Sequence, residues 1–103
     1  MRMRFHPEAR QELADAVLWY EDDYPGRGRR FQDAVERELE RVLTAPLSFP
    51  KWGRRTEARS VAIPRFPYTV IFVTVASGVV VYGVAHDKRR PGYWRRRLTR
   101  SPA

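Results

Sequence analysis

The segment from residue 85 to residue 94 holds the side chains best suited to chemistry. It carries an imidazole at His86, cations at Lys88, Arg89 and Arg90, and a phenol at Tyr93. Cleavage of RNA by its own 2′-hydroxyl needs a base for that hydroxyl, cations for the charge on phosphorus and an acid for the leaving 5′-oxygen. These residue types supply all three functions. The alternative is a polar strand end with solvated arginines, and residue types alone weigh the two equally.

Further side chains extend the catalytic hypothesis. Arg65 would point across a sheet toward His86 and bind phosphate, and an aromatic ring at Tyr93 or Trp94 would stack on a base. The alternative for residues 65–68 is structural: Phe66 fills the core and Pro67 sets a sheet edge. The candidate catalytic residues are Arg65, His86, Lys88, Arg89 and Tyr93.

Charge divides the chain into two unlike halves. The whole chain has 20 basic and 12 acidic residues, a net charge of +8; residues 1–50 hold 8 basic and 10 acidic side chains, and residues 51–103 hold 12 and 2. Eighteen of the 20 basic residues are arginine, whose planar fork suits phosphate, carboxylate and base stacking. The pattern predicts a polyanionic partner, and the alternative is a solvated basic tail. The candidate binding residues are Arg54, Arg55, Arg90, Trp94, Arg95, Arg96 and Arg97.

Composition excludes several classes of protein. The chain has no cysteine, which excludes disulfides and zinc sites that need sulfur. Its two histidines and scattered acids show no metal-ligand spacing, and no glycine-rich phosphate loop is present, so we predict neither metal nor cofactor. The first residues lack the apolar region of a signal peptide, and the longest apolar stretch, within residues 68–84, is too short and interrupted to span a membrane. We therefore expect a cytoplasmic protein without membrane contact.

Helices and strands must position these side chains. Residues 2–5 are expected to be extended, and apolar residues at spacings of three and four predict a helix from Pro7 to Asp23. Pro7 suits a first helical position, with His6 as a cap-like residue before it. A second helix is predicted at residues 28–44, ended by Pro46, and a basic loop at residues 46–57. Strands are predicted at residues 59–63, 68–75 and 79–86.

This order predicts one α+β domain over residues 1–103 with the topology β-α-α-β-β-β. The helices form a hairpin that packs on one face of an antiparallel sheet, because each element must bury its apolar side. Residues 91–98 are expected to add a short C-terminal helix, and residues 99–103 a frayed tail.

Six segments in this order resemble the RelE/ParE superfamily of toxins, in its plasmid-stabilisation branch. They are residues 5–13 (FHPEARQEL), 19–21 (WYE), 28–31 (GRRF), 46–50 (PLSFP), 65–72 (RFPYTVIF) and 84–94 (VAHDKRRPGYW). The resemblance implies a growth-inhibiting toxin of a bacterial type II toxin–antitoxin module. It implies a cognate antitoxin whose C-terminal segment wraps the toxin and covers its basic face. A homodimer and a toxin–antitoxin hetero-oligomer both remain open.

The resemblance implies two alternative mechanisms, at even weight. RelE-like members are mRNA interferases that cleave mRNA on the ribosome, and here the candidate catalytic residues would do so. ParE-like members inhibit DNA gyrase without known hydrolysis, and the C-terminal arginines and Trp94 would then be contact residues. The ending at residues 86–90 is more similar to ParE, and the Gly-Lys-Arg segment common in RelE is missing. A third hypothesis is a non-toxic nucleic-acid-binding or regulatory protein with the same fold.

Overall fold

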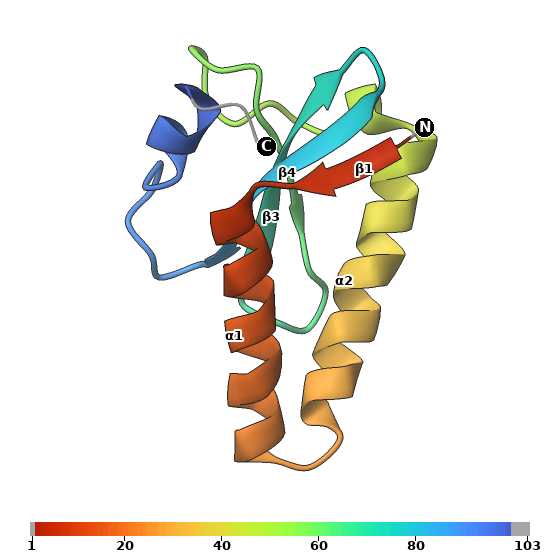
Figure 1. Ribbon diagram of the computed structural model, residues 1–103, viewed down its shortest axis with the longest axis vertical. Helices are drawn as coiled ribbons and strands as arrows, with labels where there is room; N and C mark the ends of the chain where they lie inside the picture. Colours follow the sequence, from red (N-terminus) through yellow and green to blue (C-terminus); the bar gives the residue numbers. More distant parts are fainter. Residues whose placement is uncertain (1, 100–103) are drawn as a thin grey trace.

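The computed structural model describes residues 2–99 and follows the predicted order of elements. A hairpin of two long helices lies against a four-stranded sheet (Figure 1). The strands are β1 (Arg2–Phe5), β2 (Arg59–Ala62), β3 (Tyr68–Val75) and β4 (Gly78–His86); the helices are α1 (Pro7–Asp23) and α2 (Arg27–Thr44), with short 3-10 helices η1 (Pro46–Ser48) and η2 (Arg95–Thr99). The predicted α+β class is confirmed, and the predicted ends of α1, α2 and the strands lie within one residue of those observed.

The sheet is mixed rather than wholly antiparallel. Its strand order is β1-β4-β3-β2, and β3 pairs antiparallel with both of its neighbours. β1 pairs parallel with β4, with Phe5 opposite Val81. The expectation of an antiparallel sheet was wrong for this strand, because β1 and β4 are far apart in sequence and their pairing direction leaves no local signature.

Local contacts fix where α1 begins and how the hairpin turns. The His6 ring accepts a hydrogen bond at Nδ1 from the Glu8 amide, 3.1 Å away, which confirms His6 as a cap in front of Pro7. After α1, the Glu21 carboxylate accepts hydrogen bonds from the amides of Gly26 and Gly28. These bonds satisfy amide groups at the start of α2, which no helical carbonyl can reach. The turn between the helices is therefore tied to α1.

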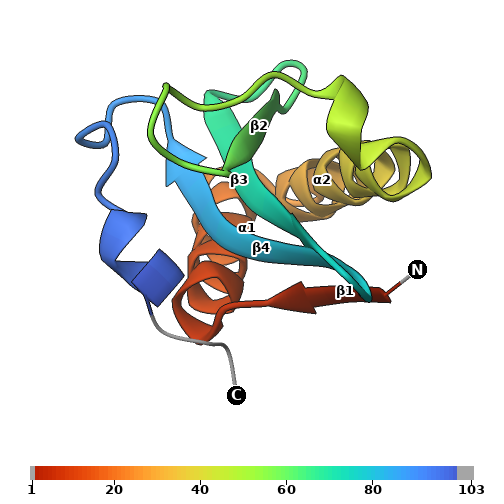
Figure 2. The same cartoon turned by 90° about the horizontal axis from the view of Figure 1, so that it is seen from above.

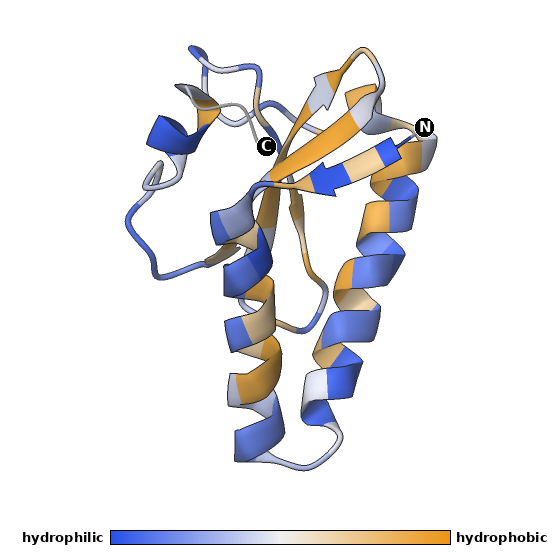
Figure 3. Cartoon of the chain, in the orientation of Figure 1, coloured by the Kyte–Doolittle hydropathy of each residue, from blue (hydrophilic) through white to orange (hydrophobic). Residues whose placement is uncertain are grey.

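Both faces of the sheet are covered. The helices pack on one face around Phe31, Val35 and Phe72, and Figure 3 shows the apolar side of α2 turned toward α1 and the sheet. A smaller cluster around Ile71 and Trp94 covers the other face, and the C-terminal segment that carries Trp94 runs beside the edge of β4 (Figure 2). Every residue of β4 except His86 is buried, which explains its nearly continuous apolar sequence.

The short C-terminal helix differs from the prediction in its type and its bounds. The short C-terminal helix is a 3-10 helix over Arg95–Thr99 rather than a turn over residues 91–98. The predicted frayed tail lies outside the described residues except for Thr99, which belongs to η2. Within residues 2–99, no helix combines the length and apolar character needed to cross a membrane.

Candidate functional site

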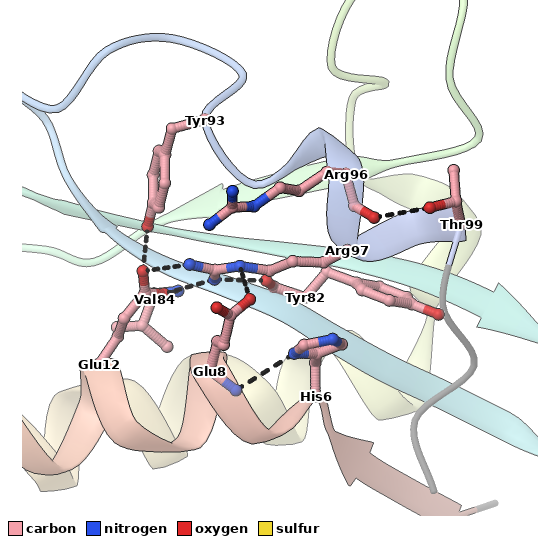
Figure 4. Close-up of polar contacts among 9 residues, drawn as sticks. All are labelled: His6, Glu8, Glu12, Tyr82, Val84, Tyr93, Arg96, Arg97 and Thr99. Carbon is pink, nitrogen blue, oxygen red and sulfur yellow. Dashed lines mark hydrogen bonds and ion pairs between the residues drawn. The ribbon is translucent and has the colours of Figure 1, made fainter.

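A polar cluster, buried at Arg97 and open to solvent at Glu8, joins the C-terminal segment to α1 and β4 (Figure 4). The Arg97 guanidinium donates from Nη1 and Nη2 to the two carboxylate oxygens of Glu12, at 3.0 and 2.9 Å. The Tyr93 hydroxyl donates to Glu12 Oε2 at 2.6 Å. Arg97 Nε lies 3.0 Å from Glu8 Oε2 as an ion pair that lacks hydrogen-bond alignment. Glu12 is therefore the centre of this cluster.

The cluster exists because β1 is shorter than β4. β1 ends at Phe5, opposite Val81, so the next part of β4 has no strand beside it on that edge. Side chains take the place of the missing strand: the Val84 amide donates to Glu12 Oε1 at 2.9 Å, and Arg97 Nη1 donates to the Tyr82 carbonyl at 3.0 Å. Buried backbone groups left unpaired would cost free energy, so Glu12 and Arg97 complete this edge.

The same contacts decide the protonation states. Burial raises the pKa of the Glu12 carboxyl, but hydrogen bonds from Arg97, Tyr93 and the Val84 amide outweigh burial and lower it below its ordinary 4.5. Burial and the bond to Glu12 raise the pKa of the Tyr93 hydroxyl far above its ordinary 10.0. Glu12 is thus a carboxylate at neutral pH, and Tyr93 keeps its proton. Tyr93 is poorly placed to act as a base.

His86 lies at the end of β4, outside the polar cluster around Glu12 and beside a groove on the surface. Its ring packs edge-on against Tyr68, with centroids 5.1 Å apart, and its Nδ1 accepts from the Lys88 amide at 3.1 Å. A groove of about 240 Å³ beside it is also lined by Trp19 and Arg89. The other ring nitrogen, Nε2, makes no hydrogen bond within residues 2–99, so it is the atom of His86 left for a partner.

The basic candidates divide into an exposed set and a buried one. The Arg89 guanidinium stacks on the Tyr93 ring, 3.9 Å from its centroid, and the Arg95 guanidinium lies 5.0 Å from that of Trp52. Stacking holds each guanidinium plane while its N–H groups stay free. The exposed candidates are Arg54, Arg55, Arg65, Lys88, Arg89, Arg90, Arg95 and Arg96. Among the described ion pairs, none involves these eight residues.

Three sequence-based expectations need correction. Trp94 is only 1% exposed and packs edge-on against Trp52, so a partner or a base cannot reach it as a contact residue. Arg97 is 6% exposed and holds Glu12, so it is not a surface cation. Arg65 does not point toward His86, because its turn carries it to a groove beside α2. The structure brings together His86, Arg89 and the ring of Tyr93, and leaves Arg65 apart from them.

Sequence reasoning missed Glu12 and Glu8. Both lie near the start of a helix, where the helix dipole by itself favours an acidic residue. Nothing in the sequence therefore indicates a further role for them. Their partner, Arg97, lies in a run of three arginines that suggests a solvated face. Arg97 differs from its neighbours only because it reaches the unpaired edge of β4. That edge results from the pairing of the strands, so the sequence around Arg97 does not reveal it. Among the described residues, no group of three or more potential metal ligands comes together.

Comparison with known families decides the classification. The model of the ParE toxin of type II toxin–antitoxin systems, parDE, matches residues 3–91. The chain belongs to the ParE toxin family. No curated protein sequence matches it closely. Among solved structures, it is similar to the chromosomal ParDE TA system from P. aeruginosa, with a TM-score of 0.73 and 10% identity over 84% of this chain and 95% of that chain. This ParE-family chain thus shares its fold with a structure that has diverged almost completely in sequence.

Proposed function

We propose that this ParE-family toxin inhibits growth by binding DNA gyrase, without cleaving RNA. One observation carries the proposal: the Tyr93 hydroxyl is committed to Glu12, while Arg65 lies apart from His86 and Arg89. A nuclease needs its base, acid and phosphate-binding cations within reach of one phosphate. Arg65 and the Tyr93 hydroxyl fall outside such an arrangement, whereas His86 and Arg89 line one groove. A binding toxin needs no such assembly.

The proposed contact surface consists of the exposed arginines that follow β4 and begin η2. Arg89 and Arg90 follow β4, and Arg95 and Arg96 begin η2, next to the stacked ring of Trp52. Guanidinium groups free of ion pairs suit carboxylates or phosphates on a large partner. The cognate antitoxin would keep the toxin inactive until it is removed.

The first experiment measures ATP-dependent supercoiling of relaxed plasmid by purified gyrase in the presence of the purified chain. We expect the wild type to inhibit supercoiling and His86→Ala to inhibit equally well. The double variant Arg95→Glu/Arg96→Glu is expected to lose most of the inhibition, whereas Arg4→Glu/Arg10→Glu, at exposed positions of β1 and α1, serves as a charge-matched control.

A parallel reaction distinguishes the alternatives. A cell-free translation mixture receives the same protein, and its mRNA is mapped for new 5′ ends. Intact mRNA together with inhibited gyrase supports the proposal. Cleaved mRNA and unaffected gyrase would overturn it in favour of an mRNA interferase, and no effect in either reaction would favour a non-toxic relative.

A further inference from the structure

A pocket of about 390 Å³ lies where the start of α1 meets η2. It is lined by His6, Glu8, Arg96 and Arg97, and it is distinct from the groove beside His86. Figure 4 shows the first two of these side chains on the α1 side and the two arginines on the η2 side. Its volume lies within the range of sites that bind small molecules. We call it the α1–η2 pocket.

His6 gives this pocket a hydrogen-bond donor that no other described group uses. Its backbone amide donates to the Val81 carbonyl at 2.8 Å, and its ring packs against the Tyr82 ring with centroids 5.8 Å apart, so the ring is held in place. Because Nδ1 accepts from the Glu8 amide, the neutral ring carries its proton on Nε2. Nε2 makes no hydrogen bond within residues 2–99, although His6 is only 8% exposed. A buried donor of this kind normally has a partner.

The two arginines place positive charge on the opposite side of the pocket. The terminal nitrogens of Arg97 bind Glu12 and the Tyr82 carbonyl, whereas its Nε is buried and makes no hydrogen bond. Arg96 is exposed and forms no ion pair within residues 2–99. The start of α1 adds the partial positive charge of its dipole. The pocket therefore combines two unused N–H donors with a free guanidinium.

Glu8 supplies the single carboxylate of the lining. Its Oε2 lies 3.0 Å from Arg97 Nε without the alignment of a hydrogen bond, and its side chain is 50% exposed. An ion pair with a half-exposed partner contributes little, because water can solvate the carboxylate almost as well. Glu8 can therefore turn toward solvent and leave its position beside Arg97 to an incoming anion.

We propose that the α1–η2 pocket binds a phosphate group, carried by inorganic phosphate or by a phosphate monoester, in competition with the Glu8 carboxylate. The phosphate oxygens accept hydrogen bonds from His6 Nε2, Arg96 and Arg97 Nε. A tetrahedral oxyanion suits donors that approach from several sides, and hydrogen bonds from charged donors to such an anion are strong. A terminal phosphate reaches recessed donors more easily than a diester, which carries a substituent on two sides. The proposal does not depend on the gyrase target.

The test follows the ring nitrogens of the purified full chain, labelled with isotope at histidine, by NMR. Chloride is replaced by inorganic phosphate or by adenosine monophosphate at constant pH and ionic strength, and His86→Gln assigns the two rings. We expect a saturable shift of the His6 Nε2 signal with both ligands. Equal affinities would support recognition of the phosphate group alone, and tighter binding of the nucleotide would support a monoester as the ligand.

Variants of the lining separate a ligand site from a structural one. Arg96→Gln and His6→Asn should each weaken binding roughly tenfold; asparagine keeps the helix cap but lacks the ring, so its binding is followed by the phosphorus line width of the ligand. Glu8→Gln should bind roughly three times more tightly, because the competing carboxylate is gone. A purely structural Glu8 would change only stability. Arg30→Gln, an exposed charge-matched control near the start of α2, should bind as the wild type does.

Three results would overturn the proposal. The first is the absence of a saturable shift at His6. The second is wild-type affinity in both Arg96→Gln and Glu8→Gln, which would indicate general attraction of anions to a basic surface. The third is tighter binding of an oligonucleotide without terminal phosphates, lost in the same variants, which would assign the pocket to the backbone of a nucleic acid.

Discussion

The Glu12 carboxylate on α1 accepts two hydrogen bonds from the Arg97 guanidinium, although 85 residues separate the two in the sequence. Their side chains are 16% and 7% exposed, so the pair is largely desolvated. A buried pair of this kind contributes little relative to apolar residues of the same size, but the loss of one partner leaves an uncompensated charge. The pair therefore fixes the position of the C-terminal segment more than it raises stability.

Glu12→Ala is expected to lower the free energy of unfolding by about 3–5 kcal/mol, because Arg97 would remain buried without its carboxylate. The measurement is urea unfolding followed by tryptophan fluorescence. The double variant Glu12→Leu/Arg97→Met should be less destabilised than the single variant, since it leaves no buried charge. A single variant as stable as the wild type would contradict this view of the cluster.

The lowered pKa of Glu12 predicts a loss of stability in acid. The folded protein holds the pKa below the ordinary 4.5, so the unfolded chain binds the proton more readily. The stabilisation is complete above the unfolded value and is lost as pH falls through the folded one. The urea midpoint of the wild type should therefore fall between pH 5 and pH 3, and that of Glu12→Gln should fall less steeply. Parallel curves for the two proteins would exclude Glu12 as the group responsible.

Tyr93→Phe is expected to cost about 1.5–3 kcal/mol of stability, the usual contribution of a hydrogen bond to a charged group. Gyrase inhibition should persist, because the hydroxyl takes no part in the proposed function. Tyr82→Phe is the matched control: Tyr82 is buried, and its hydroxyl makes no hydrogen bond within residues 2–99. Loss of toxicity in Tyr93→Phe at unchanged stability would instead point to chemistry at this hydroxyl.

Gly78→Ala tests the pairing of the first and last strands. Gly78 has φ 152°, and a Cβ there would lie 1.8 Å from the Arg2 carbonyl oxygen on β1. Because backbone atoms cannot move aside easily, we expect a loss of about 2–3 kcal/mol and faster hydrogen exchange in β1. Gly53→Ala is the control, since Gly53 also has positive φ but meets nothing within 4 Å. Its cost should be about 1 kcal/mol, and equal losses in the two variants would refute the steric argument.

Local signals in the sequence predicted the elements well. Pro7, the cap at His6 and the regular apolar spacing determine α1 through contacts between neighbouring residues. The dense β-branched residues of β3 and β4 do the same for the central hairpin. Each of these signals acts within a few residues, so reading the chain in order is sufficient to find it.

The site depends on contacts that no local signal contains. Arg97 resembles Arg95 and Arg96 in sequence, and only the short length of β1 gives it a buried carbonyl and a carboxylate to bind. Arg65 lies three residues before Tyr68, the partner of His86 in the sheet, yet one turn with positive φ directs it to α2 instead. Sheet register and backbone turn, rather than residue type, decide which cations share a surface.

The central strand β4 also has a consequence for the rate of folding. Its hairpin with β3 forms between neighbours in sequence, on a timescale of about microseconds, whereas β1 reaches it only after residues 6–77 have closed into a loop. Such non-local pairing slows folding. Until β1, Glu12 and Arg97 arrive, the outer edge of β4 is an open edge that strands of other molecules can join. We therefore expect the chain to be most exposed to aggregation before β1 pairs, and the yield of refolded protein should fall as its concentration rises.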